Sequence, residues 1–183
     1  MPVQIGQPRE SGFGEPLGLL SDCHRRIERF LAVLNRVAAE CAGRRLSVEE
    51  QSVFENALRY FREAAPRHTA DEEESLFPRL RSSKDPAART TLDSLAALEA
   101  DHSVAARDHG VVDALGRKWM DAGRLSAEEH RTLGGALGRL SKLYARHIVV
   151  EDAELFPLAA RVLQPEDLAS IGKEMAARRG LLR

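Results

Sequence analysis

HTADEEESLFP at residues 68–78 and HIVVEDAELFP at residues 147–157 share one pattern, H-x-x-x-E followed by L-F-P. On an α-helix, residues i and i+4 lie on the same face, one turn apart. Each segment can therefore offer an imidazole and a carboxylate to the same point. The repetition of this segment decides how the rest of the chain is interpreted.

A wider duplication surrounds the two segments. RLSVEE at residues 45–50 matches RLSAEE at residues 124–129, with the offset of 79 residues that also separates the two histidine segments. His24 and His102 are separated by 78 residues, one fewer. The chain is thus interpreted as a duplicated helical hairpin. Two such hairpins predict an all-α, up-down-up-down four-helix bundle with short loops.

Apolar residues at helical spacing, together with helix-capping residues, predict where the helices lie. The expected helices run from Pro16 to near Gly43, from the capping box at Ser47 to residues 78–80, from Asp85-Pro86 to residues 121–123, and from the capping box at Ser126 onwards. Pro66 lies inside the second helix and predicts a kink just before His68. A short tail helix is expected from Pro165. The predicted organisation is a flexible N-terminal arm (1–15), the bundle (16–162) and the tail helix (163–183).

The bulk composition excludes several classes of protein. The 183 residues include 27 basic and 28 acidic side chains, a net charge of -1, which gives no electrostatic reason to expect a nucleic-acid or membrane partner. No apolar run approaches the roughly 18 residues of a transmembrane helix, and residues 1–14 do not resemble a signal peptide. We therefore expect a cytoplasmic protein whose two cysteines, Cys23 and Cys41, are reduced.

The inward-facing histidines are predicted to meet at one level of the bundle. Measured from the turn of each hairpin, the four depths agree within roughly one helical turn at about 1.5 Å per residue. Burying these imidazoles and two carboxylates without a partner would be very costly, and a metal supplies the partner. The predicted metal ligands are His24, His68, Glu72, His102, His147 and Glu151.

The ligand types narrow the choice of metal. Six ligands are too many for one structural zinc, and calcium or magnesium would prefer oxygen throughout. Imidazole with carboxylate suits iron, manganese, zinc or copper. Two equivalent sites, each with two histidines and bridged by both glutamates, would make a compact di-metal centre. A ferritin-like site is disfavoured, because it needs two E-x-x-H motifs and only residues 99–102 supply one.

With these residues in place, the chain resembles the haemerythrin-like (HHE cation-binding) family over residues 17–161. The resemblance is carried by Asp22-Cys-His24, by Asp101-His102, and by the two H-x-x-x-E segments with their L-F-P endings. It implies a non-haem centre of two iron ions with an oxo or hydroxo bridge. It also implies small ligands such as O₂, peroxide or nitric oxide, with zinc or manganese as substitutes for iron.

The chain departs from oxygen-carrying haemerythrins at one position. Those proteins have a fifth histidine, four residues after the first on the third helix, and here that position is Ala106. The set of four histidines and two glutamates is similar instead to di-iron proteins linked to repair of iron centres. This resemblance implies open metal positions, which favour reaction with small molecules over simple carriage.

Other residues are candidates for supporting roles. Tyr144 and His109 both face inward, so Tyr144 is a candidate hydrogen-bond donor or radical carrier and His109 a candidate channel residue. The alternative for Tyr144 is a core tyrosine whose hydroxyl reaches a carbonyl. Glu28 is interpreted mainly as a rim residue, and Glu154 is weighed as an acid behind the metal ligands.

Three functions follow as hypotheses. The first is a di-iron protein that reacts with O₂, peroxide or nitric oxide, which would make it an oxidoreductase. The second is a non-catalytic sensor, carrier or iron-handling protein, signalling to a protein partner through the tail at residues 165–183. The third is a structural bundle loaded with zinc or manganese.

Overall fold

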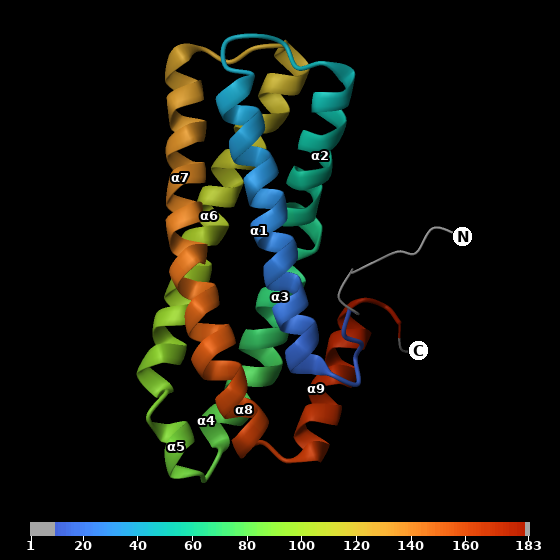
Figure 1. Cartoon of the computed structure of the whole chain (residues 1–183), viewed down its shortest axis with the longest axis vertical. Helices are drawn as coiled ribbons and strands as arrows, with labels where there is room; N and C mark the ends of the chain where they lie inside the picture. Colours follow the sequence, from blue (N-terminus) through green and yellow to red (C-terminus); the bar gives the residue numbers. More distant parts are fainter. Residues whose placement is uncertain (1–9, 182–183) are drawn as a thin grey trace, which may run out of the picture.

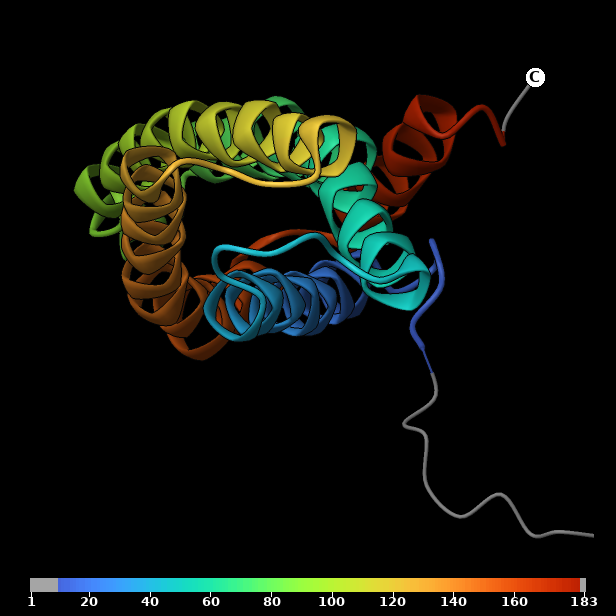
Figure 2. The ribbon, with the colours of Figure 1, turned by 90° about the horizontal axis from the view of Figure 1, so that it is seen from above.

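Four long helices set the long axis of the molecule (Figure 1). In the computed structural model, which describes residues 10–181, they are α1 (Pro16–Glu40), α2 (Val48–Glu63), α6 (Leu92–Ala122) and α7 (Ala127–Val150). Viewed from above, they form a ring in which each helix packs against its two neighbours (Figure 2). The predicted all-α four-helix bundle is confirmed.

Shorter elements complete the lower half of the molecule in Figure 1. They are α3 (Ala65–Asp71), α4 (Phe77–Ser82), α5 (Pro86–Arg89), α8 (Phe156–Val162) and α9 (Pro165–Arg178). Two π-helical turns, η1 (Glu72–Leu76) and η2 (Glu151–Leu155), connect α3 to α4 and α7 to α8. The predicted tail helix is α9, and it packs beside α1 and α3 on the outside of the ring. Within residues 10–181, every helix is too short or too polar to span a membrane.

The capping residues start the helices where the sequence places them. The Ser47 hydroxyl accepts the Glu50 amide proton, and the Glu50 carboxylate accepts that of Ser47, which is the reciprocal capping box. Ser126 and Glu129 repeat this arrangement before α7. The two hairpins are therefore copies in local structure as well as in sequence.

Two predicted helices are interrupted in the structure. Ala64 separates α2 from α3, because Pro66 lacks the amide proton that a continuous helix would direct to the preceding turn. The prediction that this helix ends at residues 78–80 is two residues short, because α4 follows the π-turn and ends at Ser82. The third predicted helix is also divided, since residues 90–91 separate α5 from α6.

Segments at the two ends of the described chain meet on one side of the bundle. Residues 1–9 of the predicted arm and residues 182–183 of the tail lie outside the described residues. The amide of Ser11 donates to the Asp22 carboxylate at 2.6 Å. Phe13 lies so close to Gly172 of α9 that an added Cβ would be 1.9 Å from its carbonyl oxygen. Glycine at 172 is thus required by the close approach of these two segments.

The apolar core is divided by a polar layer. One cluster, which includes Ile27, Ala105 and Ile148, fills the bundle above it. A second, which includes Leu20, Leu98 and Leu155, fills the bundle below. His24 lies between Leu20 and Ile27 along the chain, and His102 lies between Leu98 and Ala105. Ala65 and Leu76 flank His68 and Glu72 in the same way, and Tyr144 and Leu155 flank His147 and Glu151, so all six predicted ligands lie between the two clusters.

Candidate metal centre

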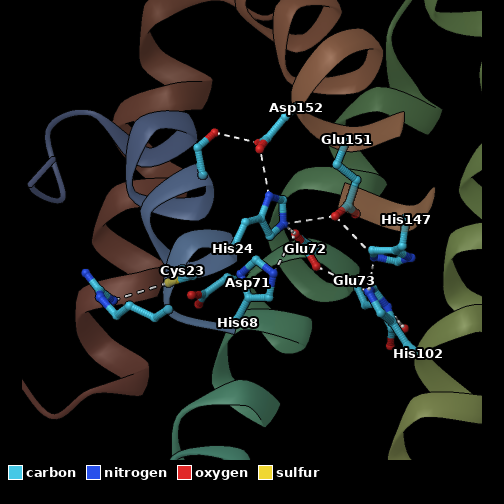
Figure 3. Close-up of polar contacts among 12 residues, drawn as sticks. Cys23, His24, His68, Asp71, Glu72, Glu73, His102, His147, Glu151 and Asp152 are labelled. Atoms are coloured by element: carbon cyan, nitrogen blue, oxygen red, sulfur yellow. Dashed lines mark hydrogen bonds and ion pairs between the residues drawn. The ribbon is translucent and has the colours of Figure 1, made fainter. Parts of the chain in front are cut away.

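The six predicted ligands come from all four walls of the bundle and meet in its interior (Figure 3). None has more than 8% of its surface exposed. They are His24 on α1, His68 on α3, Glu72 on η1, His102 on α6, His147 on α7 and Glu151 on η2. The four histidines, which lie at matching distances along the chain from the hairpin turns, therefore do converge with the two glutamates in the structure.

The ligand atoms fall into two groups that share both carboxylates. His24, His68, Glu72 and Glu151 form one group, whose ligand atoms lie within 4.8 Å of one another. His68 Nε2 lies 3.2 Å from Glu72 Oε1, and His24 Nε2 lies 3.1 Å from Glu151 Oε2. This group joins the two histidines of the first hairpin.

The second group contains the histidines of the other hairpin. His102 and His147 join the same two glutamates, again within 4.8 Å. His147 Nε2 lies 3.1 Å from Glu151 Oε2, and His102 Nε2 lies 3.4 Å from Glu72 Oε2. All four imidazoles therefore present Nε2 to the carboxylate pair, and each carboxylate contacts histidines of both hairpins.

The π-turns begin at the two central glutamates. The Phe77 amide donates to the Glu72 carbonyl and the Phe156 amide to the Glu151 carbonyl, five residues back in each case. A proline follows each phenylalanine and cannot donate to a helical carbonyl. Such π-turns are rare and often occur at functional sites. The H-x-x-x-E-to-L-F-P pattern thus encodes a wide turn that immediately follows the carboxylate.

Each segment also supports a histidine of the opposite hairpin. His24 Nδ1 lies 3.0 Å from Asp152 Oδ1, and His102 Nδ1 lies 2.8 Å from Glu73 Oε1. A carboxylate on Nδ1 fixes the ring so that Nε2 carries the free lone pair for a metal. Asp152 and Glu73 each directly follow a central glutamate, one in each copy.

The phenylalanine of each L-F-P stacks on the histidine that the acid of its own segment supports. Phe156 lies parallel to His24 with ring centroids 5.5 Å apart, and Phe77 lies parallel to His102 at 6.3 Å. One face of each imidazole is therefore covered and its Nδ1 is held. Together these contacts explain why the L-F-P ending accompanies the H-x-x-x-E in both copies.

The carboxylates control the protonation of the cluster. Burial acts to lower the pKa of His24, but its contacts with the Asp152 and Glu151 carboxylates outweigh it and raise this pKa to about 12. The pKa of His102 likewise rises to about 9, because contacts with Glu72 and Glu73 overcome burial. Without a bound metal each of these two rings is in its charged form and carries one extra proton. Metal binding must therefore release that proton from each ring.

Two other members of the cluster shift in the opposite direction. Burial lowers the pKa of His68. For Glu72, burial acts to raise the pKa, but the neighbouring His68, His102 and His24 outweigh it and hold the pKa well below its usual range. An ionised carboxylate at the centre of the cluster is the form that a cation requires.

Unpaired buried atoms test whether the cluster fits a metal. His24 Nε2 and both carboxylate oxygens of Glu72 and of Glu151 are buried and have no hydrogen-bond partner. Buried polar atoms are normally paired, and these five all point into the centre of the cluster. A set of imidazole nitrogens and carboxylate oxygens suits a first-row transition metal. The residues present therefore fit a metal site of the His/Glu type.

The two supporting candidates lie together beside the centre. The Tyr144 hydroxyl is 3.0 Å from His109 Nε2, so it bonds another side chain and not a carbonyl. The Tyr144 and His147 rings have centroids 6.4 Å apart, which places the pair outside the ligand set. Burial lowers the pKa of His109 to about 4 and raises the pKa of Tyr144. Both groups are therefore neutral near pH 7.

The remaining sequence candidates do not join the site. Glu28 and Glu154 are exposed, so the expectation that Glu28 is a rim residue agrees with the structure, and Glu154 takes no place behind the ligands. Two residues of the acidic run at 71–74, besides the ligand Glu72, are not part of a solvated face. Glu73 bonds His102, and Asp71 is fully buried.

The residues that the sequence did not single out share a detectable feature. Glu73 and Asp152 are both acidic and are separated by the same offset of 79 residues as the ligands. Applying the duplication to every residue of the segment would have found them. The duplication could not have identified Asp71, because its counterpart in the second copy is Val150, which is not acidic.

Comparison with known proteins agrees with this geometry. A protein of Haemophilus influenzae, described only as uncharacterized, is 28% identical over 178 residues, covering 97% of this chain and 98% of its own. The family model of the hemerythrin HHE cation binding domain matches residues 15–159, a range that contains all six ligand candidates. The chain therefore belongs to the hemerythrin HHE cation-binding domain family.

Proposed function

We propose that the chain holds two iron ions at this centre and reacts there with O₂, peroxide or nitric oxide. The observation that carries the proposal is the sharing of both Glu72 and Glu151 between two histidine pairs. This arrangement is suited to two cations held side by side, since each carboxylate can offer one oxygen to each. Iron is preferred because imidazole with carboxylate suits it and because its redox activity gives the open site a use.

The surrounding residues would tune the pair of metals. Glu73 and Asp152 orient His102 and His24, and the stacked phenylalanines exclude water from those rings. Redox-active metals with open positions supply reactivity towards small oxidants. Ala106 supports an open position, because it lines a cavity that reaches the ligand histidines and offers only a methyl group.

Rapid mixing tests the proposed reactivity. The reduced protein is mixed separately with O₂, hydrogen peroxide and nitric oxide, and the optical spectrum is followed. We expect a change with at least one of the three. Unchanged spectra with all three, in protein shown to contain two iron ions, would contradict the proposed reactivity.

A second candidate function is a redox sensor that signals through α9. Arg178, the last residue of this helix, and Arg179, which follows it, bond the Asp71 carboxylate at 3.0 and 2.7 Å, and Asp71 directly precedes Glu72. A change in the metals would therefore act on a turn to which the tail helix is tied. Hydrogen exchange in α9 would differ between oxidised and reduced protein if the tail reports the metal state to a protein partner. Equal exchange would leave only the first candidate.

We also propose a reducing compartment, which for this chain means the cytoplasm. Cys23 and Cys41 are both free and buried, and burial raises the pKa of each thiol. Such thiols behave as small apolar residues and not as reactive groups.

A further inference from the structure

A cavity of about 340 Å³ connects the surface of the bundle to the ligand histidines. All four ligand histidines line it, and it also reaches His109 and Tyr144. Its outer wall includes Pro66 and Thr69 of α3 and Ala106 and Gly110 of α6. The cavity therefore extends beyond the metal centre through the upper half of the bundle.

The sequence keeps this wall open. The break at Ala64 separates α2 from α3, and α3 packs chiefly on α1, α2 and α9 rather than on α6. On the opposite side, Gly110 has no atom within 4 Å of the position that a Cβ would take. The break before Pro66 thus faces two small residues, Ala106 and Gly110, across the mouth. Arg62 and Asp113 form a 2.6 Å ion pair among the lining residues.

The size and lining suit an organic molecule better than a diatomic gas alone. A cavity of roughly 150 Å³ is enough to bind benzene, and this one has more than twice that volume. Between the polar ends its wall is made of apolar side chains, namely Ile27, Leu34, Leu58, Phe61, Ala105 and Val112. Pockets of this size with few polar groups are typical of small-molecule sites.

The polar pair in the wall indicates which functional group the molecule carries. His109 stacks on Phe61 with ring centroids 4.2 Å apart, which fixes its ring, and its Nε2 faces the Tyr144 hydroxyl. If the Tyr144 hydroxyl donates its hydrogen bond to His109, the Tyr144 oxygen can still accept a hydrogen bond from a ligand. If His109 donates instead, the Tyr144 hydroxyl is free to donate. A hydroxyl group, which both donates and accepts, is suited to either arrangement.

We propose that this cavity binds a mainly apolar alcohol or phenol of one or two rings, with its hydroxyl on Tyr144 and its body among the apolar wall residues. The inference rests on the proposed function only for the inner end of the cavity, which the metal ligands form. The polar pair occurs in one half of the duplication only, because the counterparts of His109 and Tyr144 are Leu31 and Ala65. The ligand would therefore lie on the α6–α7 side of the cavity.

Calorimetric titration with 2-naphthol tests the site on the full chain as purified with its metals. We expect binding of one molecule per chain. Gly110→Leu puts a side chain into the mouth and should abolish the heat of binding. Gly134→Leu on α7 is the matched control, since Gly134 is also exposed with open space around it, and should leave binding unchanged.

Naphthalene, which lacks the hydroxyl, tests the orientation. Wild-type protein should prefer 2-naphthol by about fivefold, the net contribution of one hydrogen bond, and Tyr144→Phe should remove this preference. No binding of 2-naphthol, or equal binding to the Gly110→Leu variant, would overturn the inference. Metal analysis of the same samples separates the two proposals. Two metals without naphthol binding contradict only the cavity site, and naphthol binding without metal contradicts only the proposed function.

Discussion

The two H-x-x-x-E segments face the same centre but have different surroundings. Towards the metal site they are equivalent, because each supplies a histidine, a shared glutamate, an acid for the opposite hairpin's histidine and a stacking phenylalanine. Behind the site they diverge. The first segment is tied to α9 through charged side chains, whereas the second is supported by apolar packing.

One pair of positions shows the difference most clearly. Asp71 is fully buried and bonds Arg178 and Arg179, and Arg178 also donates to the Ser75 hydroxyl at 2.8 Å. Its counterpart Val150 is partly buried against the lower apolar cluster. The duplication has thus kept the histidine, the glutamate and the phenylalanine of the metal site, and has kept an acid, Glu73 or Asp152, beside each glutamate. It has changed residues whose role is set by what packs outside, and only the first copy lies under α9.

Removing a central glutamate should have the largest effect and should be equal in the two copies. Glu72 and Glu151 each belong to both ligand groups. Glu72→Ala or Glu151→Ala is therefore expected to lose at least one metal ion per chain, measured by elemental analysis, and His147→Ala should do the same. Glu154→Ala, at an exposed position, is the control and should keep full metal content. Two metals in either central variant would show that the ligand set is wrong.

Breaking the tie to α9 should affect the first copy alone. Asp71→Ala leaves two arginines without their buried partner and is expected to lower the free energy of unfolding by about 3 kcal/mol. Val150→Ala removes only part of an apolar contact and should cost about 1 kcal/mol. Urea denaturation measures both. Equal losses would mean that the arginine pair does not distinguish the two segments.

Removing the orienting acids should give two moderate and matching effects. Glu73→Ala frees His102, and Asp152→Ala frees His24, so each variant should weaken metal affinity by about 10- to 100-fold. Competition with a chelator measures the affinity. A loss in only one variant would contradict the symmetrical role that the contacts indicate.

The smallest expected effect concerns the polar pair of the second half. Tyr144→Phe removes the hydrogen bond to His109 and should lower the free energy of unfolding by about 1 kcal/mol. Metal content should stay unchanged, because Tyr144 is not among the ligands. Loss of metal in this variant would show that Tyr144 takes part in metal binding.

Much of the fold and of the centre could be predicted because the duplication multiplies weak patterns. One H-x-x-x-E says little, but two copies with a fixed offset identify equivalent positions and so four histidines at one level. Helix starts were also predictable, since the capping boxes at Ser47 and Ser126 are local features of the sequence.

The features that sequence did not predict depend on contacts between distant residues or on backbone geometry. Asp71 pairs with Arg178, 107 residues away, and no local sequence pattern predicts this pairing. The prolines after Phe77 and Phe156 mark a disturbance of the helix, but not that it takes the form of a π-turn. The bond between His109 and Tyr144 likewise depends on how α6 and α7 pack.

The central claim is that these six side chains hold two iron ions. Elemental analysis with an optical spectrum, on protein purified from iron-replete cells, tests it most directly. We predict two iron ions per chain, with the near-ultraviolet and visible absorption that a ferric pair shows and zinc does not. Zinc without iron, or a single metal ion per chain in protein whose six ligand residues are intact, would contradict the claim.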